Sequence, residues 1–317
     1  MSSDERSHGI VDGAAGPAIV RMPPLIDRQF DHWMVAIAGG MSLVFERAHD
    51  RPDQSGKLVP RGLYRFDLAT STWSRLPVDP GPTPRRWFTV TANADGSRVI
   101  VVTHRVDDAP ADAERPWDST TTTVSEIVGG HSRQVGTLRG MWREGNEPAA
   151  YLSPDGALLA LSIHEQGTWS TQCVVLDMAT GHRVAHHAGA NPCGSAAWSP
   201  DGRHLLVTTS GAPGVLDLDT LEIGPLPIAP GRLGEPGGGR AFPAGFLDDN
   251  HLLIYSERHN YTRETTNLTI ASVPVQGTER TPLYTWTAPR FNQYIRPQFV
   301  APIHERLKSL ANPSSEG

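Results

Sequence analysis

The chain repeats one short pattern, and this repeat restricts its possible folds more than any other feature of the sequence. Tyr151–Val184 and Trp198–Leu226 each begin with an aromatic residue followed by Ser-Pro-Asp-Gly, an apolar stretch, and a second apolar stretch that ends in Leu-Asp. Phe88–Val102 and Phe246–Tyr255 are weaker copies, with Asp-Gly and Asp-Asn at the same place. Because Gly and Asn tolerate the positive φ that hairpin turns need, each copy predicts antiparallel strands joined by a tight turn.

A fifth unit opens the chain, and it supplies a family resemblance. Trp33–Gly40 is an apolar strand, and Leu63–Pro77 resembles a kelch repeat, in which a strand ends in Asp and a later Trp packs against the blade. We therefore expect Trp73 to pack within its blade. The Ser-Pro-Asp-Gly units resemble WD-repeat-like and TolB-like β-propellers over roughly residues 33–302, although no copy has the Gly-His and Trp-Asp pairs of a WD repeat. The resemblance implies a fold and leaves the activity open.

The repeat predicts an all-β fold, a β-propeller of four-stranded antiparallel blades. One such sheet cannot bury both of its faces alone, whereas sheets packed radially bury both and protect their edges. Inner strands crowd near the axis and need small residues. Three units have small residues just before their aromatic: Ala149-Ala150, Ser195-Ala196-Ala197 and Ala244-Gly245.

The number of blades depends on how the ring closes. Residues 296–302 resemble the inner-strand segments of other units but have no strand partner after them. If they complete the first blade, the N- and C-terminal strands pair to close a ring of five blades. If Trp33–Ala38 is instead the inner strand of its own blade, residues 18–22 and 296–302 build a partial sixth. We expect one domain over residues 18–303, with a disordered N-terminus (1–17) and a polar tail (304–317).

Composition excludes several classes of partner. The formal net charge is −6 and no block of Lys or Arg occurs, which argues against binding to nucleic acid or to an anionic membrane. The N-terminus lacks the apolar region of a secretory signal, and no apolar run is long enough for a membrane span. Cys173 and Cys193 form no disulfide framework. We expect a cytoplasmic monomer with free thiols, against which stand two glycosylation sequons at Asn260 and Asn267.

The two faces of such a ring differ. The Asp-Gly turns lie on one face; the loops between the second and third strands, and the loops that enter each inner strand, lie on the other, which we call the loop-rich face. The long loops between second and third strands run roughly over residues 45–62, 104–123, 164–172, 208–214 and 256–267. Function concentrates in loops held by a rigid scaffold, so we predict the ligand site on the loop-rich face at the mouth of the central pore.

Candidate acid and base residues lie where the second strands end. A count of eight residues from the turn Gly gives His104 and His164, and the same count in the last unit gives Arg258, beside Glu257. Glu46 lies near the analogous place in the first unit. Histidines and glutamates around one mouth could bind a metal or transfer protons. The alternative is that they are solvated residues on the rims of separate blades. No His-Glu-x-x-His or Cys-x-x-Cys motif is present, so we predict neither a metal nor a cofactor.

Arginines and aromatic residues recur around the same face. Arginine contacts carboxylate or phosphate in a bidentate way, and aromatic rings supply rigid apolar contact. Such a set suits a small anionic or planar ligand, or a protein partner. The alternative is internal, with arginines paired to nearby glutamates and tryptophans filling the ring. The candidate ligand-binding residues are Arg86, Trp87, Trp142, Arg143, Glu144, Asn191, Arg240, Phe242, Arg258, Arg290, Asn292, Tyr294 and Arg296.

Two functions from different classes follow. The leading hypothesis is a binding module for a small molecule or protein, because no catalytic motif accompanies the loop-rich face. The alternative is a cofactor-independent enzyme, a lyase, cyclase or hydrolase, that acts on a small anionic metabolite. In that enzyme His104 and His164 are acid or base, Glu46 or Glu257 polarises them, and Arg86, Arg143 and Arg296 hold the substrate. A metal-dependent hydrolase is a third interpretation.

Overall fold

The computed structural model describes residues 9–12, 16–19, 34–37, 42–47, 51–52, 56, 58–67, 70, 72–78, 86–93, 96–106, 120–139, 150–164, 171–193, 197–209, 212–226, 240–260, 265–277 and 279–288. Its secondary structure over these ranges is entirely β. In this part of the chain no helix is long and apolar enough to cross a membrane.

Five antiparallel sheets of four strands each make up the fold, and each is a blade. Blade 1 contains β3 (Met34–Ile37), β4 (Ser42–Arg47), β7 (Gly62–Asp67) and β8 (Thr72–Arg75). Blade 2 contains β9 (Arg86–Ala92), β10 (Arg98–Val106), β11 (Thr120–Val128) and β12 (His131–Arg139). Blade 3 contains β13 (Ala150–Leu152), β14 (Leu158–His164), β15 (Thr171–Asp177) and β16 (Arg183–Ala188).

The last two blades follow the same order. Blade 4 contains β17 (Ala190–Pro192), β18 (His204–Thr209), β19 (Ala212–Asp217) and β20 (Ile223–Pro225). Blade 5 contains β21 (Arg240–Phe246), β22 (His251–Asn260), β23 (Thr265–Pro274) and β24 (Thr281–Ala288). Two hairpins lie outside the blades: β1 (Gly9–Asp12) with β2 (Gly16–Ile19), and β5 (Arg51–Pro52) with β6 (Leu58–Val59).

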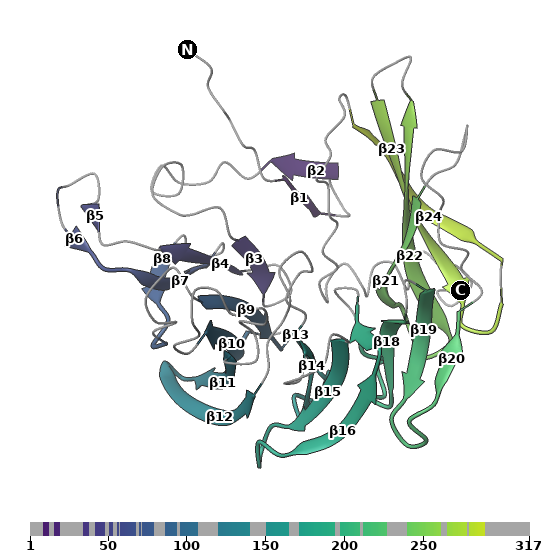
Figure 1. Cartoon of the computed structure of the whole chain (residues 1–317). Coiled ribbons are helices and arrows are strands. Elements are labelled where there is room, and N and C mark those ends of the chain that lie inside the picture. Colours follow the sequence, from purple (N-terminus) through teal and green to yellow (C-terminus); the bar gives the residue numbers. More distant parts are fainter. Residues whose placement is uncertain are drawn as a thin grey trace, which may run out of the picture.

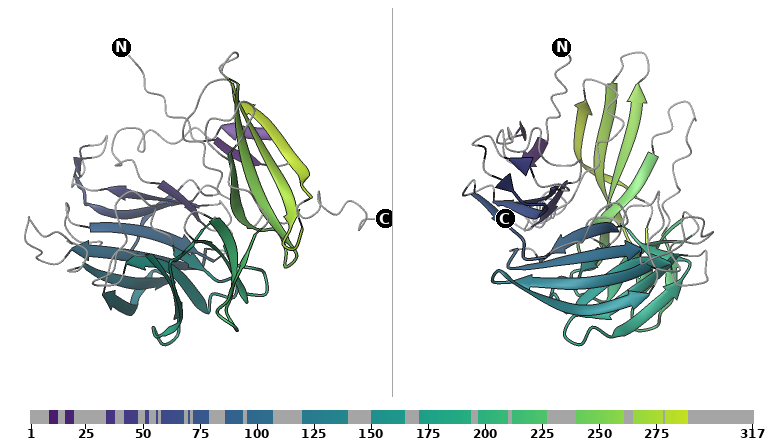
Figure 2. Two further views of the ribbon diagram at one scale, coloured as in Figure 1. Left: turned by 45° about the vertical axis from the view of Figure 1, so that its right-hand side comes forward. Right: turned by 60° about the vertical axis from the view of Figure 1, so that its left-hand side comes forward.

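The blades follow one another around an axis in the order of the chain. Figure 1 shows blade 1 at the left, blades 2 to 4 below, and blade 5 at the right, with the β1–β2 hairpin drawn between the first and the last sheet. In both views of Figure 2 the strands of blade 5 run at a steep angle to those of blades 1 and 2, as sheets arranged around an axis must. The predicted five-bladed propeller of four-stranded antiparallel sheets is confirmed.

The predicted tight turns form as the sequence indicates. Gly96, Gly156 and Gly202 have φ of 67°, 73° and 72°, in the left-handed region that glycine enters without a Cβ clash. In blade 3, Asp155 Oδ1 accepts hydrogen bonds from Ser153 Oγ at 2.6 Å and from the Ala157 amide at 2.9 Å. The Asp side chain therefore closes the turn that joins the first and second strands.

The apolar core lies between blades. Val44 and Leu63 of blade 1 pack with Val99 and Val101 of blade 2. Alternate residues of a strand point to opposite faces, so the next residues along β10 face the other neighbour. There Ile100 and Val102 pack with Leu159, Leu161 and Ile163 of blade 3. On the far face of blade 3, Ala160, Cys173 and Val175 pack with Ala190, Trp198 and Leu206 of blade 4.

Polar contacts tie the blades together as well. Arg65 of blade 1 donates from Nη1 to the Gly96 carbonyl of blade 2 at 2.9 Å, and Arg98 of blade 2 donates to the Gly156 carbonyl of blade 3. The indole Nε1 of Trp198 donates to the Tyr151 carbonyl at 2.8 Å, which joins blades 3 and 4. These bonds join blade 1 to blade 2, blade 2 to blade 3, and blade 3 to blade 4.

The first blade differs from the leading sequence prediction. The four strands of blade 1 all come from residues 34–75, so Met34–Ile37 is the inner strand of its own blade. Residues 296–302 and the tail (304–317) lie outside the described residues, so ring closure by the terminal strands stays a prediction. The predicted domain boundary at residue 18 falls inside the β1–β2 hairpin, in which Ala18 pairs with Ile10.

Candidate functional site

The predicted loops begin later than the sequence suggested, so the candidate residues lie on strands. β10 continues to Val106 and β11 starts at Thr120, and β22 continues to Asn260 before β23 starts at Thr265. The loop that enters the inner strand of blade 4 was predicted at roughly residues 189–197, but β17 (Ala190–Pro192) lies within it, and Asn191 of β17 pairs with Thr208. A side chain on a strand is held more firmly than one on a loop, so these candidate residues have positions that the sheet fixes.

His104 is buried on β10 and is hydrogen-bonded to the neighbouring strand of its blade. Its side chain is 3% exposed, and its Nδ1 shares a hydrogen bond of 2.8 Å with Oγ1 of Thr122 on β11. Burial lowers the pKa of His104 to about 4, because an apolar interior disfavours the charged imidazolium. His104 shares its face of β10 with Ile100 and Val102, which places it in the interface between blades 2 and 3.

His164 has the equivalent position in blade 3 but faces the next interface. It is 4% exposed, and Oγ1 of Thr171 lies 3.2 Å from its Nε2. It shares its face of β14 with Ala160, which packs against blade 4. On the same face Ser162 Oγ donates to Asn191 Oδ1 of blade 4 at 2.7 Å. Asn191, a predicted ligand residue, therefore links two blades.

The two histidines do not lie in one site. Blade 3 separates the interface that contains His104 from the interface that contains His164. Each imidazole bonds a threonine on the adjacent strand of its own blade. They are buried strand residues rather than the solvated rim residues that the sequence left as the alternative.

The two predicted glutamates and Arg258 are placed by the hairpin registers. In the turns before β10 and β14, an amide bonds the carbonyl five residues later: Asn93 to Arg98, and Ser153 to Leu158. In the turn before β22, the Leu247 amide bonds the His251 carbonyl only four residues later, so this turn is one residue shorter. The positions six residues after Arg98, Leu158 and His251 are therefore equivalent. They are His104, His164 and Glu257, so Glu257 rather than Arg258 is the counterpart of the two histidines. Arg258 itself is exposed on β22. Glu46 is half-buried on the face of β4 that Val44 turns to blade 2.

Four other candidates are placed only by their backbones. Trp87 pairs with His104 and Arg86 with Arg105, between β9 and β10. Arg240 pairs with Glu257, and Phe242 with Tyr255, between β21 and β22. The remaining candidates lie outside the described residues: Trp142, Arg143, Glu144, Arg290, Asn292, Tyr294 and Arg296.

One buried acceptor near the histidines has no hydrogen-bond partner. Within the described ranges, Oε1 of Gln172 is buried without one, and the residue is 7% exposed. Gln172 shares its face of β15 with Val174 and Leu176, so it belongs to the same interface as His104. The described residues contain no group of three or more His, Cys, Asp or Glu side chains that could hold a metal ion.

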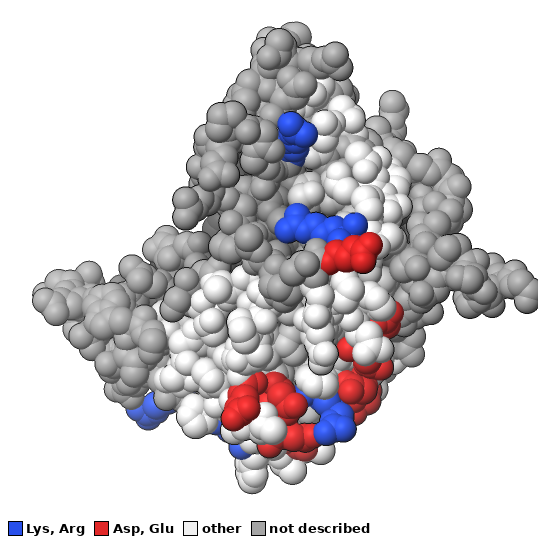
Figure 3. All heavy atoms as spheres, turned by 90° about the vertical axis from the view of Figure 1, so that its right-hand side faces the viewer, with Lys and Arg blue, Asp and Glu red and all other residues white. Residues whose placement is uncertain are grey.

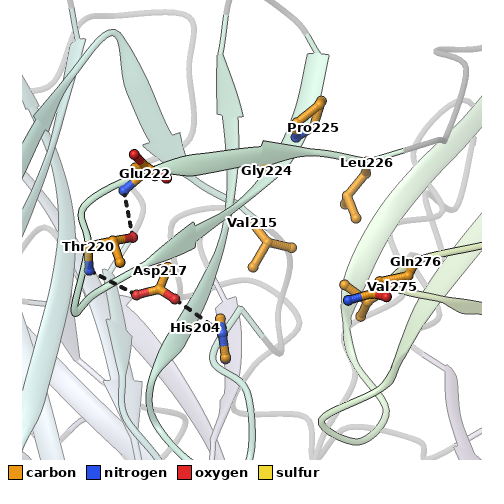
Figure 4. A pocket seen from close by; sticks show the side chains of 10 residues that line it. All are labelled: His204, Val215, Asp217, Thr220, Glu222, Gly224, Pro225, Leu226, Val275 and Gln276. Atoms are coloured by element: carbon orange, nitrogen blue, oxygen red, sulfur yellow. Dashed lines mark hydrogen bonds and ion pairs between the residues drawn. The ribbon is translucent and has the colours of Figure 1, made fainter.

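A cavity of about 600 Å³ lies on the opposite side of the ring from the predicted site. It opens between the β19–β20 hairpin of blade 4 and the β23–β24 turn of blade 5 (Figure 4). Its lining residues are His204, Val215, Asp217, Thr220, Glu222, Gly224, Pro225, Leu226, Val275 and Gln276. The sequence did not predict this cavity, because the short turns of the repeats resemble one another. The sequence feature that could have indicated it is the concentration of acidic residues in the turns of the last two units.

No protein-family model matches the chain, and no curated protein matches its sequence. Among solved structures it is similar to an oligogalacturonate lyase from Vibrio parahaemolyticus, with 11% identity, 79% of this chain and 64% of that chain covered, and a TM-score of 0.49. TolB from Acinetobacter baumannii has 14% identity, coverage of 78% and 53%, and a TM-score of 0.42. The β-propeller domain of the Trilobed protease from Pyrococcus furiosus has 10% identity, coverage of 77% and 68%, and a TM-score of 0.41. The chain thus spans 64% and 53% of the first two chains, and these similarities carry no argument about activity.

Proposed function

We propose that the chain is a β-propeller that binds a small molecule or a protein partner through the loop-rich face at the mouth of its pore. The observation that supports this proposal is the separation of His104 and His164 into two interfaces between blades. A proton donor and acceptor must both come within hydrogen-bond distance of one substrate. Two buried imidazoles on opposite faces of blade 3 are better suited to fixing strand ends than to sharing a substrate.

The protonation state of His104 supports the same conclusion. Its pKa of about 4, lowered by burial, leaves roughly one imidazole in a thousand protonated at pH 7. An imidazole with so low a pKa is a weak base and is rarely charged, so it is poorly matched to proton transfer near neutral pH. As a neutral ring bonded to Thr122, it holds β10 to β11 just below the loop that joins them.

A firmly held base beneath the loops of this face favours binding. Hydrogen bonds of His104 to Thr122, His164 to Thr171 and Ser162 to Asn191 fix the strand ends from which the loops of this face arise. Loops mounted on fixed ends lose less conformational entropy when they bind. The arginines and aromatic residues predicted around the face favour a small anionic or planar ligand, or the aromatic and arginine anchors of a protein interface.

Ligand-observed NMR with benzoate, a planar anion, tests this proposal, with neutral benzamide as its isostere. We expect saturable binding of benzoate that weakens about tenfold in an Arg86→Gln, Arg296→Gln double variant. The matched control is Arg203→Gln, an exposed arginine on the turn side of blade 4. An equal response to benzoate and benzamide, or an equal loss in the control, would contradict a site on the loop-rich face.

The second candidate is a cofactor-independent enzyme that acts on a small anionic metabolite at the same face. The observation that favours it is the buried, unpartnered Oε1 of Gln172 in the interface that contains His104, because buried acceptors without partners are uncommon. Incubation with a metabolite mixture, followed by mass spectrometry, tests this alternative. Turnover that is lost in His104→Ala or His164→Ala would establish the enzyme and overturn the binding proposal.

We also infer that the first unit is kelch-like and the later units WD-repeat-like. In blade 1 the centroid of the Trp73 ring lies 4.7 Å from that of Phe66 and 5.5 Å from that of Phe45. These distances support the expected packing of Trp73 within the blade. The free thiols of Cys173 and Cys193 support a reducing compartment such as the cytoplasm.

A further inference from the structure

The cavity between blades 4 and 5 is separate from the loop-rich face. Its lining includes Thr220 of the β19–β20 turn and Gln276 of the β23–β24 turn. In the first turn the Leu218 amide bonds the Arg203 carbonyl, and in the second the Val275 amide bonds the Asn250 carbonyl. Because both turns are anchored by backbone bonds, the two walls are held apart by the fold rather than by loop position. Its volume of about 600 Å³ lies within the range of small-molecule sites.

One wall of this cavity is apolar. Val215 and Leu226 of blade 4 are 9% and 8% exposed, and they belong to the core cluster that joins blades 3, 4 and 5. Val275 packs against the same cluster from blade 5. In Figure 4 the side chains of Val215 and Leu226 extend into the space that Val275 and Gln276 border from the other side. This wall offers an apolar surface to part of a ligand.

The other end of the cavity is acidic. Asp217 Oδ1 accepts hydrogen bonds from the amides of Asp219 at 2.8 Å and Thr220 at 3.0 Å, while Oδ2 lies 3.8 Å from His204 Nε2. Those amide bonds lower the pKa of Asp217, so the carboxylate is ionised at neutral pH. Glu222 also lines the cavity.

The charge around the cavity is predominantly negative. Figure 3 shows acidic side chains gathered over the turn end of this face of the molecule. The acidic residues of these turns are Asp201, Asp217, Asp219, Glu222, Asp248 and Asp249. The cation Arg203 is paired with Asp219, and the β23–β24 turn adds one acidic and one basic residue, Glu279 and Arg280. A cleft bordered by one sign of charge concentrates ions of the opposite sign.

We propose that this cavity binds a small organic cation, a protonated amine or guanidinium carried on a short apolar body. The apolar part packs against Val215, Leu226 and Val275, and the cationic group approaches Oδ2 of Asp217, the oxygen that accepts neither amide bond of the turn. An ammonium group has donors for a carboxylate, and an apolar body removes the wall from water, so each end of the ligand matches one end of the cavity. This site is independent of the function proposed for the loop-rich face.

The test uses phenethylammonium as the probe at pH 8. Affinity would be measured by ligand-observed NMR for the full chain, with 2-phenylethanol and phenylacetate as the neutral and anionic analogues. We expect saturable binding of the cation, weaker binding of the alcohol by about tenfold, and no binding of the anion.

Two substitutions locate the charge. Asp217→Asn keeps the Oδ1 acceptor that closes the turn and removes the charge, and we expect it to weaken phenethylammonium binding about tenfold. The matched control is Asp177→Asn, because Asp177 Oδ1 closes the same turn in blade 3, with the Thr180 amide at 2.7 Å, away from the cavity. Asp177→Asn should leave the affinity unchanged.

A third substitution keeps the test decisive if either turn variant is poorly folded. Val275→Lys introduces a competing cation on the opposite wall at a half-buried position, and we expect it to abolish binding. Three results would overturn the proposal: no saturable binding of phenethylammonium, equal affinity for the alcohol, or binding unchanged in Asp217→Asn and Val275→Lys. None of these results bears on benzoate binding at the loop-rich face.

Discussion

His104 makes the stability of the fold sensitive to acid. Burial lowers its pKa from 6.5 to about 4 in the folded chain. A base with a lowered folded pKa contributes stability above its unfolded pKa, and this contribution is lost as the pH falls through the folded value. Between pH 6.5 and 4 we therefore expect the free energy of unfolding to fall by up to about 3 kcal/mol more in the wild type than in His104→Gln. Urea unfolding curves across this range measure the difference, and parallel pH profiles would contradict it.

The two thiols predict a second pH effect, of the opposite sign. Burial raises the pKa of Cys173 and of Cys193 from 9.0 to about 12. Because the folded pKa is the higher one, the stability from each thiol is complete below pH 9 and is lost as the pH rises toward 12. We expect a disulfide reagent at pH 8 to label neither thiol in the folded chain and both after unfolding. Rapid labelling of Cys173 in the folded chain would show that the interface between blades 3 and 4 is open.

At the residue scale, the sequence located equivalent positions but not their surroundings. Counting from the turn glycine identified His104 and His164 correctly as a pair related by the repeat. It gave Arg258 in place of Glu257, because the turn before β22 is one residue shorter and a count across it shifts by one. The burial of these side chains could not be predicted by such a count, because it depends on which neighbouring blade each face of the strand contacts.

At the element scale, the Arg98–Glu126–Arg133 network joins blade 2 to blade 3. Glu126 is 6% exposed and ion-pairs with both arginines, and Arg133 also donates to the Met178 carbonyl at 3.0 Å. Burial alone would raise the pKa of Glu126, but the hydrogen bonds from Arg133 and Arg98 outweigh it and lower the pKa. We expect Glu126→Gln to lower the free energy of unfolding by about 2–3 kcal/mol, because it leaves two arginines without their carboxylate.

The matched control for this network is Asp219→Asn. Asp219 pairs with Arg203, and their side chains are 59% and 64% exposed. Exposed ion pairs contribute little, so we expect a change within about 0.5 kcal/mol by chemical denaturation. An equal loss in the two variants would show that the buried network does not join the blades.

The packing of blade 2 against blade 3 predicts a cost for any side chain at Gly181. This residue has φ of 71°, and a Cβ there would lie 2.1 Å from the Val135 carbonyl oxygen of β12. Gly181→Ala should therefore lower the free energy of unfolding by about 2–4 kcal/mol, from the clash and the backbone strain together. Gly129→Ala, at φ of 57° with no atom within 4 Å, should cost only about 1 kcal/mol. Equal melting temperatures for the two variants would contradict this contact.

The sequence was strongest at the scale of elements. Asp-Gly turns and apolar alternation identified the strand pairs of four units, and the residues Ala150, Ala197 and Ala244 are buried near the inner strands as expected. Strand ends were harder, because threonine-rich segments such as Thr120–Thr123 read as loop while they pair as β11 with β10. Polar β-branched residues form strands when a neighbouring strand satisfies their backbone, and composition alone does not show that neighbour.

At the scale of the whole molecule, the repeat was sufficient to predict the ring. One hairpin unit repeated along the chain gives successive sheets that share cores with their neighbours, and blades 1 to 5 do so in order. The prediction that the loop-rich face holds the ligand site was based on loop length. Loop length indicates where sequence variation is tolerated, and it does not indicate where a cavity lies. The cavity between blades 4 and 5 arises from the angle between two sheets, and no sequence pattern encodes that angle directly.

Hydrogen–deuterium exchange of the full chain with and without saturating benzoate tests the binding assignment most directly. A ligand on the loop-rich face should slow exchange at the strand ends beneath it, in peptides that cover residues 101–106, 160–164 and 188–193. The turns at 153–158 and 199–204, on the opposite face, should exchange at the same rate with and without ligand. Protection confined to those turns, or to residues 217–226, would contradict a working site on the loop-rich face.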